Sequence, residues 1–272
     1  MIERKTILIR LYPNAIQEPL FRKTGGCVRL IKNLGLEQRA TYGRRHPLNY
    51  YSQRAELKAL KADFPFFKEV PHHCLQEGLI DLDRAFANFF SGRSGFPKRQ
   101  RKRDGVSFRF PDPTQFRIEG DIATPDKKRT RKIKDVILHL PKFGAVKAVM
   151  HRALPHGAVI RSITVSSDGD WWNASLLYER EIGQPTDRSA ETVIGIDVNV
   201  SQPIATSEGE IIDFPKVTQR ERERERRLHR NITPKQKGSK NRRKAIRTLA
   251  RFKSAQARRR KGCSGKIHHL SR

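Results

Sequence analysis

One carboxylate in the sequence has the setting of a catalytic or metal-binding group. Asp197 interrupts a stretch of strand-forming apolar residues that runs from Val193 to Val200. A charged side chain inside such a stretch is costly to bury unless a partner such as a metal ion compensates its charge. The alternative is an aspartate that ends a strand and caps a turn, which is the commoner role of a single aspartate. Asp197 is therefore a candidate catalytic residue and a candidate metal ligand.

Three short strands are predicted to position this aspartate. The first surrounds Asp197, the second covers residues 204–206, and the third covers residues 210–213, with residues 207–209 as the turn between the last two. The predicted order is strand, loop, strand, turn, strand. The aspartate lies in the middle of the first strand.

A second kind of chemistry is indicated by the basic residues. The chain has 57 lysines and arginines against 28 acidic residues, a net charge of +29 and a pI near 10.8. Residues 216–272 contribute +19 of this charge, from 22 basic residues and three glutamates. A further basic run spans residues 98–103, and a strand beside it interleaves Arg109 with two phenylalanines. Such a balance favours a polyanionic partner, most simply nucleic acid.

Phosphate binding is the favoured interpretation of these clusters, and a solvated surface or a tail that orders only with its partner is the alternative. The candidate nucleic-acid-binding residues are Lys98, Arg99, Arg101, Lys102, Arg103, Arg109, Lys235, Lys237, Lys240, Arg242, Arg243, Lys244, Arg247, Arg251, Arg258, Arg259 and Arg260.

Membrane and secreted classes are disfavoured. No apolar run approaches the roughly 18 residues of a membrane span, and the start of the chain does not have the pattern of a signal peptide. Three scattered cysteines favour a reduced, cytoplasmic setting. With a nucleic-acid partner, the expected location is the nucleoid. The cysteines form no Cys-x-x-Cys pair, so no zinc ribbon is predicted.

The remaining pattern predicts an α+β chain. A strand over residues 4–11 is followed by helices that begin near Asn14, at residue 52 and at residue 72. Strands are predicted around residues 107–111, 116–122, 136–140, 158–166 and 171–180, and then a polar linker over 183–191. Two basic helices follow, near residues 220–230 and 239–261, the second with a narrow seam of Ala245, Leu249, Phe252 and Gln256.

Several of these segments resemble one known family. Gly195-Ile196-Asp197-Val198 and the segment 204–212 resemble the first RuvC motif of the TnpB (OrfB) proteins of bacterial insertion sequences, which are relatives of the type V CRISPR effectors. Asn199 stands where that family usually has glycine. Residues 10–39, 75–90, 140–144, 171–172 and 235–261 also resemble the family, so the resemblance covers nearly the whole chain.

The resemblance implies a domain order. Residues 1–12 and 98–182 would form a small wedge-type β-barrel, residues 13–97 a helical recognition insert, and residues 192–272 the first part of a RuvC-like, RNase-H-like nuclease domain with arginine-rich helices. Asp197 would be the first catalytic carboxylate and would bind Mg²⁺. The partners would be DNA and a structured guide RNA. The family's later glutamate, zinc ribbon and last aspartate have no counterpart here, so a carboxy-terminally truncated member is expected.

Three functions remain open. The chain could be an RNA-guided, magnesium-dependent DNA endonuclease of a transposable element, either ancestrally or together with a missing carboxy-terminal nuclease half. It could be a catalytically dead module that binds guide RNA and DNA. It could also be a decayed fragment with general RNA binding. Because a two-metal nuclease needs several converging carboxylates, the chain by itself is expected to bind nucleic acid without cutting it.

Overall fold

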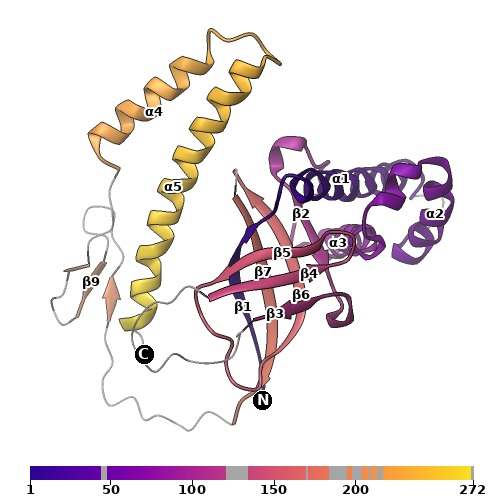
Figure 1. Cartoon of the computed structure of the whole chain (residues 1–272), viewed down its shortest axis with the longest axis horizontal. Helices are drawn as coiled ribbons and strands as arrows, with labels where there is room; N and C mark the ends of the chain where they lie inside the picture. The colour runs from indigo at the N-terminus through magenta and orange to yellow at the C-terminus, as the bar shows by residue number, and fades with distance from the viewer. Residues whose placement is uncertain are drawn as a thin grey trace. The chain divides into compact units, whose positions relative to one another are not determined.

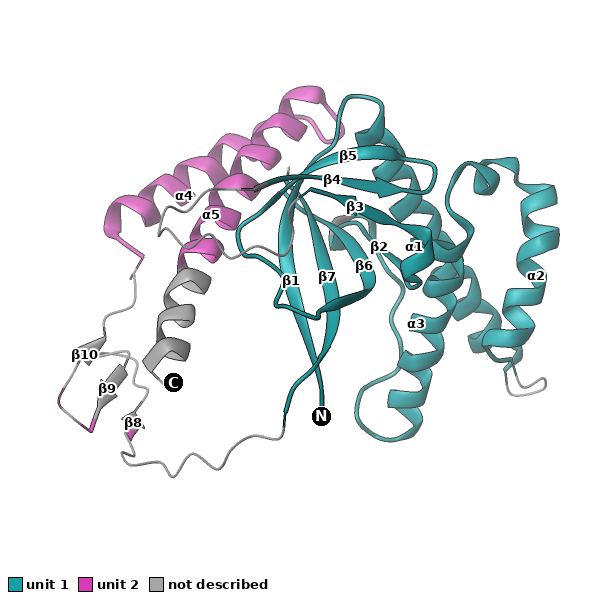
Figure 2. Cartoon of the chain, turned by 60° about the horizontal axis from the view of Figure 1, so that its bottom comes forward, with its two compact units in different colours: residues 1–183 teal, residues 184–272 magenta. Residues whose placement is uncertain are grey.

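The computed structural model describes residues 1–43, 48–120, 134–169, 171–183, 195–197, 204–207, 209, 211–212 and 217–270. Within these ranges, the side chains of residues 103, 134, 196–197, 204–206, 211–212 and 260–270 are not described. The chain divides into two compact units, residues 1–183 and residues 184–272 (Figure 2). The predicted linker, residues 183–191, lies almost entirely outside the described residues.

The first unit is built on one antiparallel sheet of seven strands in the order β2-β6-β7-β1-β5-β4-β3. In Figure 1 the strands β1, β6 and β7 run roughly along one direction and β4 and β5 cross them. The strands are β1 (Ile2–Tyr12), β2 (Ser107–Phe110), β3 (Arg117–Glu119), β4 (Lys134–Leu140), β5 (Gly144–Met150), β6 (Val159–Asp168) and β7 (Trp171–Glu181).

The long first strand joins the two halves of this sheet. β1 pairs with β7 from Ile2 to Leu11, but it pairs with β5 only over Arg10, Leu11 and Tyr12. The β5 half of the sheet therefore diverges from β1 after three residues, and the sheet curls into a half-barrel. Within the described residues β2 and β3 are the two ends of the row, so the sheet is open where a closed barrel was expected.

Alternating side chains give the sheet one buried face. On β7, Trp172, Ala174, Leu176 and Tyr178 are at most 5% exposed, as their spacing of two predicts. On β2, Phe108 and Phe110 are buried as well. The two phenylalanines therefore belong to the core and are not available to stack on nucleic-acid bases. Arg109, between them, points to the opposite face.

Three helices cover one part of the first unit (Figure 1). Asn14 caps the first of them, because its side-chain oxygen accepts hydrogen bonds from the backbone N–H groups of Ile16 and Gln17. Asn49 caps the second through a reciprocal capping box with Ser52. The helices are α1 (Gln17–Tyr42), α2 (Tyr50–Asp63) and α3 (His72–Phe90), close to the predicted positions.

The first turns of α1 attach the helices to the sheet. The amide of Gln17 donates hydrogen bonds to the carbonyls of Phe143 and Ala145 at the β4–β5 hairpin. One turn later the fully buried ring of Phe21 makes edge contacts with Phe143 and with Trp172, at centroid distances of 4.8 and 5.0 Å. Such edge-to-face pairs add to the hydrophobic burial. Phe21 is thus the side chain that joins α1 to the core of the half-barrel.

A polar network joins the three helices to one another. The buried side chain of Gln53 on α2 donates to the carbonyl of Gly35 and accepts from Arg39 on α1. Arg39 also pairs at 2.8 Å with Asp83 on α3, and Asp83 accepts from the first N–H of α2 at Tyr50. Asp83 therefore has a structural role, because it joins all three helices.

Replacement of two neighbouring glycines of α1 by alanine is expected to change stability in opposite directions. A Cβ on Gly25 would lie 2.2 Å from Cγ1 of Val106, so Gly25→Ala is expected to lower the free energy of unfolding by about 1–3 kcal/mol. A Cβ on Gly26 would meet nothing nearer than the tip of Arg29 at 3.9 Å. Gly26→Ala should therefore raise stability by up to about 1 kcal/mol through helix propensity. Urea unfolding followed by tryptophan fluorescence tests both, and equal effects would contradict the close approach of α1 to Val106.

The second unit contains a small sheet and two helices. Its strands run consecutively and antiparallel in the order β10-β9-β8, and Asp197 pairs with Ala205. This is the strand order that the sequence predicted around Asp197. The elements are β8 (Ile196–Asp197), β9 (Ile204–Thr206), β10 (Ile211–Ile212), α4 (Gln219–Ile232) and α5 (Lys240–Leu270).

The structure therefore shows an α+β chain, with differences in detail. β5 was not predicted from the sequence, and β3, predicted over residues 116–122, has only three residues in the structure. Four of the seven residues of β5 are glycine, alanine or lysine, which have weak strand propensity. The pairing with β4 stabilises the extended conformation of this segment. Every helix in the described ranges is too short or too polar to cross a membrane.

Candidate nucleic-acid interface

Helices α4 and α5 form an antiparallel hairpin that carries 20 of the 57 lysines and arginines of the chain. Thr218 begins α4 with a capping box, in which its hydroxyl accepts from the N–H of Glu221 and the Glu221 carboxylate accepts from the N–H of Thr218. Ala245 on α5 is buried, and the side chains at 249, 252 and 256 are half-buried beside α4. The guanidinium of Arg224 on α4 lies 5.4 Å from the ring centre of Phe252. The predicted narrow seam is therefore the contact between the two helices.

Two of the three acidic side chains of α4 also face this contact. Glu221 pairs with both terminal nitrogens of Arg259, at 2.8 and 2.9 Å, and Glu225 pairs with Lys253 at 3.1 Å. These pairs take negative charge away from the outer surface of the hairpin. The third glutamate of α4, Glu223, accepts a hydrogen bond from Gln219 of the same helix.

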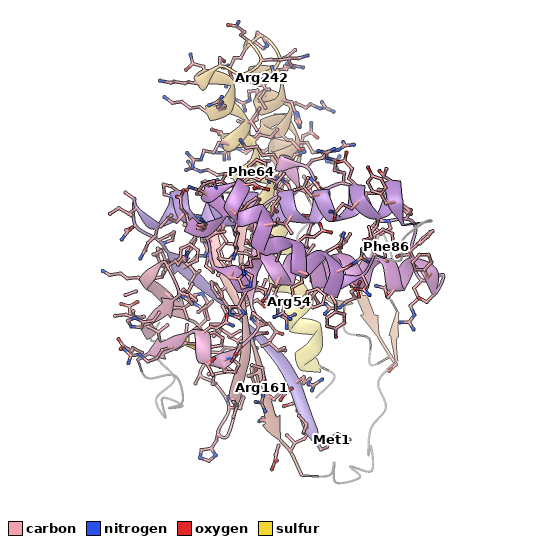
Figure 3. All side chains as sticks on the ribbon, turned by 90° about the vertical axis from the view of Figure 1, so that its right-hand side faces the viewer. Met1, Arg54, Phe64, Phe86, Arg161 and Arg242 are labelled. Atoms are coloured by element: carbon pink, nitrogen blue, oxygen red, sulfur yellow. The ribbon has the colours of Figure 1, made fainter. Side chains whose placement is uncertain are left out.

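The outer surface of the hairpin is consequently cationic. Figure 3 shows the side chains that surround α4 and α5, many of which end in nitrogen. A surface of this charge density attracts a phosphate backbone and releases its counterions. The predicted residues with exposed side chains here are Lys237, Lys240, Arg243, Lys244, Arg247, Arg251, Arg258 and Arg259.

Several of the predicted residues have side-chain contacts within the hairpin, and one of them, Arg258, donates to the hydroxyl of Ser254 at 3.1 Å. Arg242 donates to the carbonyls of Ile232 and Lys235, at 2.9 and 2.8 Å, and so holds the turn that ends α4. Lys235 donates to Asn231, and Arg259 pairs with Glu221 as described above. The contacts of Arg242, Lys235 and Arg259 give these side chains a structural role, which was not predicted from the sequence. The side chain of Arg260 lies outside the described residues.

The pairing of Glu221 predicts a pH dependence. Hydrogen bonds from Arg259 and from the Thr218 backbone lower the pKa of Glu221 from 4.5 to about 2. Because the folded pKa lies below the unfolded one, the stabilisation is present above about pH 4.5 and is lost as the pH falls towards 2. In a ¹³C NMR titration of the carboxyl group, Arg259→Gln should raise the midpoint of Glu221 towards 4.5. Lys253→Gln is the matched control, and an unchanged midpoint in Arg259→Gln would contradict the pair.

The basic run of the first unit is fixed to α1. The Asn33 side chain on α1 donates to the carbonyl of Gln100 and accepts from its N–H, at 3.0 and 2.9 Å. Asp104 closes the next turn by accepting from the N–H of Arg101. The backbone of the run is thereby held while its basic side chains point outward. Lys98, Arg99, Arg101 and Lys102 are exposed, and the side chain of Arg103 is not described.

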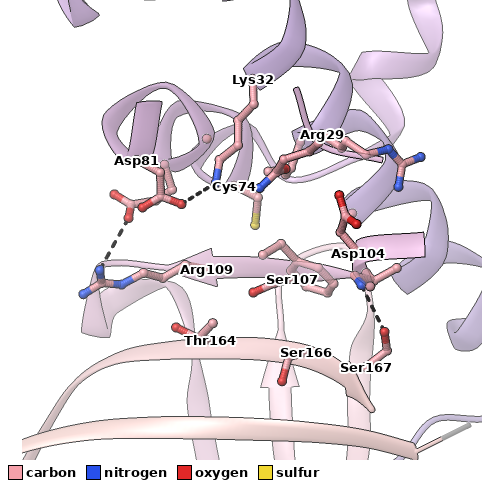
Figure 4. Close-up of a pocket in the computed structure, with 18 of the residues that line it drawn as sticks. Arg29, Lys32, Cys74, Asp81, Asp104, Ser107, Arg109, Thr164, Ser166 and Ser167 are labelled. Carbon is pink, nitrogen blue, oxygen red and sulfur yellow. Dashed lines mark hydrogen bonds and ion pairs between the residues drawn. The ribbon is translucent and has the colours of Figure 1, made fainter. Parts of the chain in front are cut away.

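Arg109 does not lie on this open surface. It borders a cavity of about 370 Å³ between the helices and the β2–β6 ladder, where it faces Glu77 of α3 (Figure 4). Neither the cavity nor the place of Glu77 in its wall was predicted from the sequence. The wall is formed by residues of α1, α3, β2 and β6, which meet only in the folded chain. The only sequence signal for Glu77 is an acid placed on the mostly buried face of α3.

Asp197 is placed by its backbone alone. It lies in β8 at the register expected for it, but its side chain is outside the described residues. Among the residues that the structure describes, no group of three histidine, cysteine or acidic side chains is positioned to hold a metal ion. One carboxylate does not complete a two-magnesium site. The described residues therefore do not fit the implied Mg²⁺ cofactor as a complete site.

Comparison with known proteins gives two long matches and one short one. The chain is 33% identical over 255 residues to a Streptomyces pristinaespiralis protein named "Putative RNA-guided DNA endonuclease", covering 91% of this chain and 59% of that protein. It is 26% identical over 252 residues to "Putative RNA-guided DNA endonuclease InsQ" of Escherichia coli strain K12, covering 90% and 58%. Residues 1–46 match the helix-turn-helix domain of OrfB_IS605 proteins.

The fold and the basic hairpin define a strongly cationic α+β protein with an arginine-rich helical surface. The matches show that the chain is similar to OrfB-type insertion-sequence proteins and, over nine tenths of its length, to proteins named as RNA-guided DNA endonucleases. It spans a little under three fifths of the length of these two relatives. The description helix-turn-helix does not fit the geometry, because the described part of residues 1–46 is one strand, β1, followed by one helix, α1.

Proposed function

We propose that residues 1–272 form the nucleic-acid-binding part of a TnpB-type RNA-guided DNA endonuclease. The partners are a structured guide RNA and DNA. In this proposal the chain by itself binds nucleic acid and does not cleave it. The proposal rests on the similarity to two relatives with that printed name over nine tenths of this chain.

The topology supports the domain roles that the resemblance implies. The first strand is hydrogen-bonded between β5 and β7, although helices α1–α3 intervene in the sequence. This is the arrangement expected of a wedge-type barrel with a helical recognition insert. The β8–β9–β10 meander with Asp197 in its first strand is the arrangement expected at the start of a RuvC-like domain.

One structural observation carries the binding role. The α4–α5 seam takes up Ala245, Leu249 and Phe252 and two of the three glutamates of the hairpin, and lysine and arginine predominate on the outside. Packing against α4 uses only one narrow face of α5, which carries Ala245, Leu249, Phe252 and Gln256. The outer surface of the hairpin is rich in lysine and arginine, and its charge matches a phosphate backbone.

The catalytic half of the proposal is tested by cleavage. Purified 1–272 should bind a labelled RNA and should leave a supercoiled plasmid intact with millimolar Mg²⁺, with or without the RNA. Asp197→Ala should bind the RNA as tightly as the parent chain. Cleavage that Asp197→Ala abolishes would refute the non-cutting role and show that the nuclease site is complete.

A further inference from the structure

The cavity beside Arg109 has an unusual acid in its wall. Glu77 on α3 is only 7% exposed, and its nearest cation is Nη1 of Arg109 at 3.8 Å, which is a long ion pair. In the part of the chain that the structure describes, no N–H or O–H group donates to its carboxylate. Burial raises the pKa of Glu77, so its charged form costs folding free energy at neutral pH. A buried carboxylate without donors can accept hydrogen bonds from a ligand.

The opposite side of the cavity is also polar. Ser107 and Arg109 on β2 and Thr164 and Ser166 on β6 lie on the face of the ladder that points away from the core (Figure 4). Arg109 already donates to Ser162, and a guanidinium has five N–H donors in all. The cavity therefore offers donors and hydroxyls on the sheet side and acceptors on the helix side.

The lining carries charges of both signs, which disfavours two simpler ligands. An inorganic phosphate would meet the carboxylates of Glu77 and Asp81. A metal ion would meet Arg109 and Lys32, and Lys32 holds Asp81 at 2.7 Å. Burial also raises the pKa of the Cys74 thiol in the wall, which makes it a poor nucleophile. The lining suits a flat neutral group with donors on one edge and acceptors beside them.

We propose that this cavity binds one unpaired guanine of the bound RNA. Guanine is the natural base that presents two adjacent donors, N1–H and the N2 amino group, on its pairing edge, and the two oxygens of a carboxylate match them. The neighbouring O6 is an acceptor for Arg109 or for a hydroxyl. The pairing edge is free only in a loop or single strand, which is where proteins read RNA bases.

The basic run gives the base a route into the cavity. Gln100, Arg101 and Asp104 belong to its lining, and the exposed residues 98–102 continue from it along the surface. A strand that follows the run with its phosphates can turn one base inward at Arg101. This inference rests on the proposed binding of RNA and adds a base preference to it.

The test compares labelled nine-residue oligouridines whose central base is guanine, inosine or adenine, with the whole chain at low salt. A bidentate contact discriminates by about tenfold or more, so the guanine oligomer should bind about tenfold more tightly than the adenine one. Inosine lacks the N2 amino group and should lose most of that gain. Glu77→Gln should abolish the preference, whereas its affinity for plain oligouridine stays within about twofold.

Two further variants separate this contact from charge and folding. Glu37→Gln makes the same change on an exposed acid of α1, and it should keep the preference. Ser166→Tyr fills the cavity from the sheet side and should remove the preference. Equal affinity for guanine and adenine oligomers, or a preference that survives in Glu77→Gln, would overturn the inference. Failure of every oligomer to bind would overturn the proposed function as well.

Discussion

Replacing Lys240, Arg243 and Lys244 by glutamine should weaken RNA binding on the order of 100-fold at 0.1 M salt. All three side chains are exposed on α5, away from the seam with α4. Each phosphate contact contributes about 0.7–0.9 to the slope of log K against log salt. The triple variant should therefore lower that slope by about two to three. Fluorescence anisotropy at four salt concentrations measures both quantities.

A charge-matched control shows whether position matters. Lys68, Lys147 and Arg152 are exposed on the first unit, and their replacement by glutamine removes the same three charges. If net charge alone attracted the RNA, the two triple variants would bind alike. We expect the control to lose less than tenfold, because it leaves the α4–α5 surface intact. Equal losses would contradict the assignment of the interface to the hairpin.

Phe21→Ala should be the most destabilising single substitution that we predict in the first unit. The ring is fully buried and contacts Phe108, Phe143 and Trp172, at centroid distances of 4.8–5.7 Å. Loss of such a ring costs about 3–5 kcal/mol, because the cavity that remains cannot close. Both tryptophans lie in this unit, so their fluorescence in a urea titration reports its unfolding.

Phe90→Ala is the matched control for this substitution. Phe90 is 78% exposed at the end of α3, and its loss should change the free energy of unfolding by less than about 1 kcal/mol. If Phe21→Ala were no more costly than Phe90→Ala, α1 would not be attached to the half-barrel through this ring.

Local patterns predicted the parts of the fold that depend on neighbours in sequence. The spacing of Trp172, Ala174, Leu176 and Tyr178 gave the buried face of β7, and the seam residues of α5 gave its contact with α4. β5 was missed because its residues have weak strand propensity and its pairing with β4 decides its conformation.

The candidate site shows the same division. Exposed lysines and arginines could be read from composition, because charge is visible residue by residue. The roles of Arg242 and Arg259 could not, since each depends on a partner seven or more residues away. The cavity at Glu77 could not either, because residues between 25 and 167 meet there only in the folded chain. The base preference proposed for it follows from tertiary structure alone.

The salt dependence of RNA binding by the unaltered chain tests the central claim most directly. A hairpin that contacts six to ten phosphates should lose on the order of 10³- to 10⁵-fold in affinity between 50 and 200 mM salt. A labelled RNA and an anisotropy titration at each concentration suffice. A loss of less than about tenfold over this range, or binding too weak to detect at 50 mM, would show that the basic surface of α4 and α5 does not hold a nucleic acid.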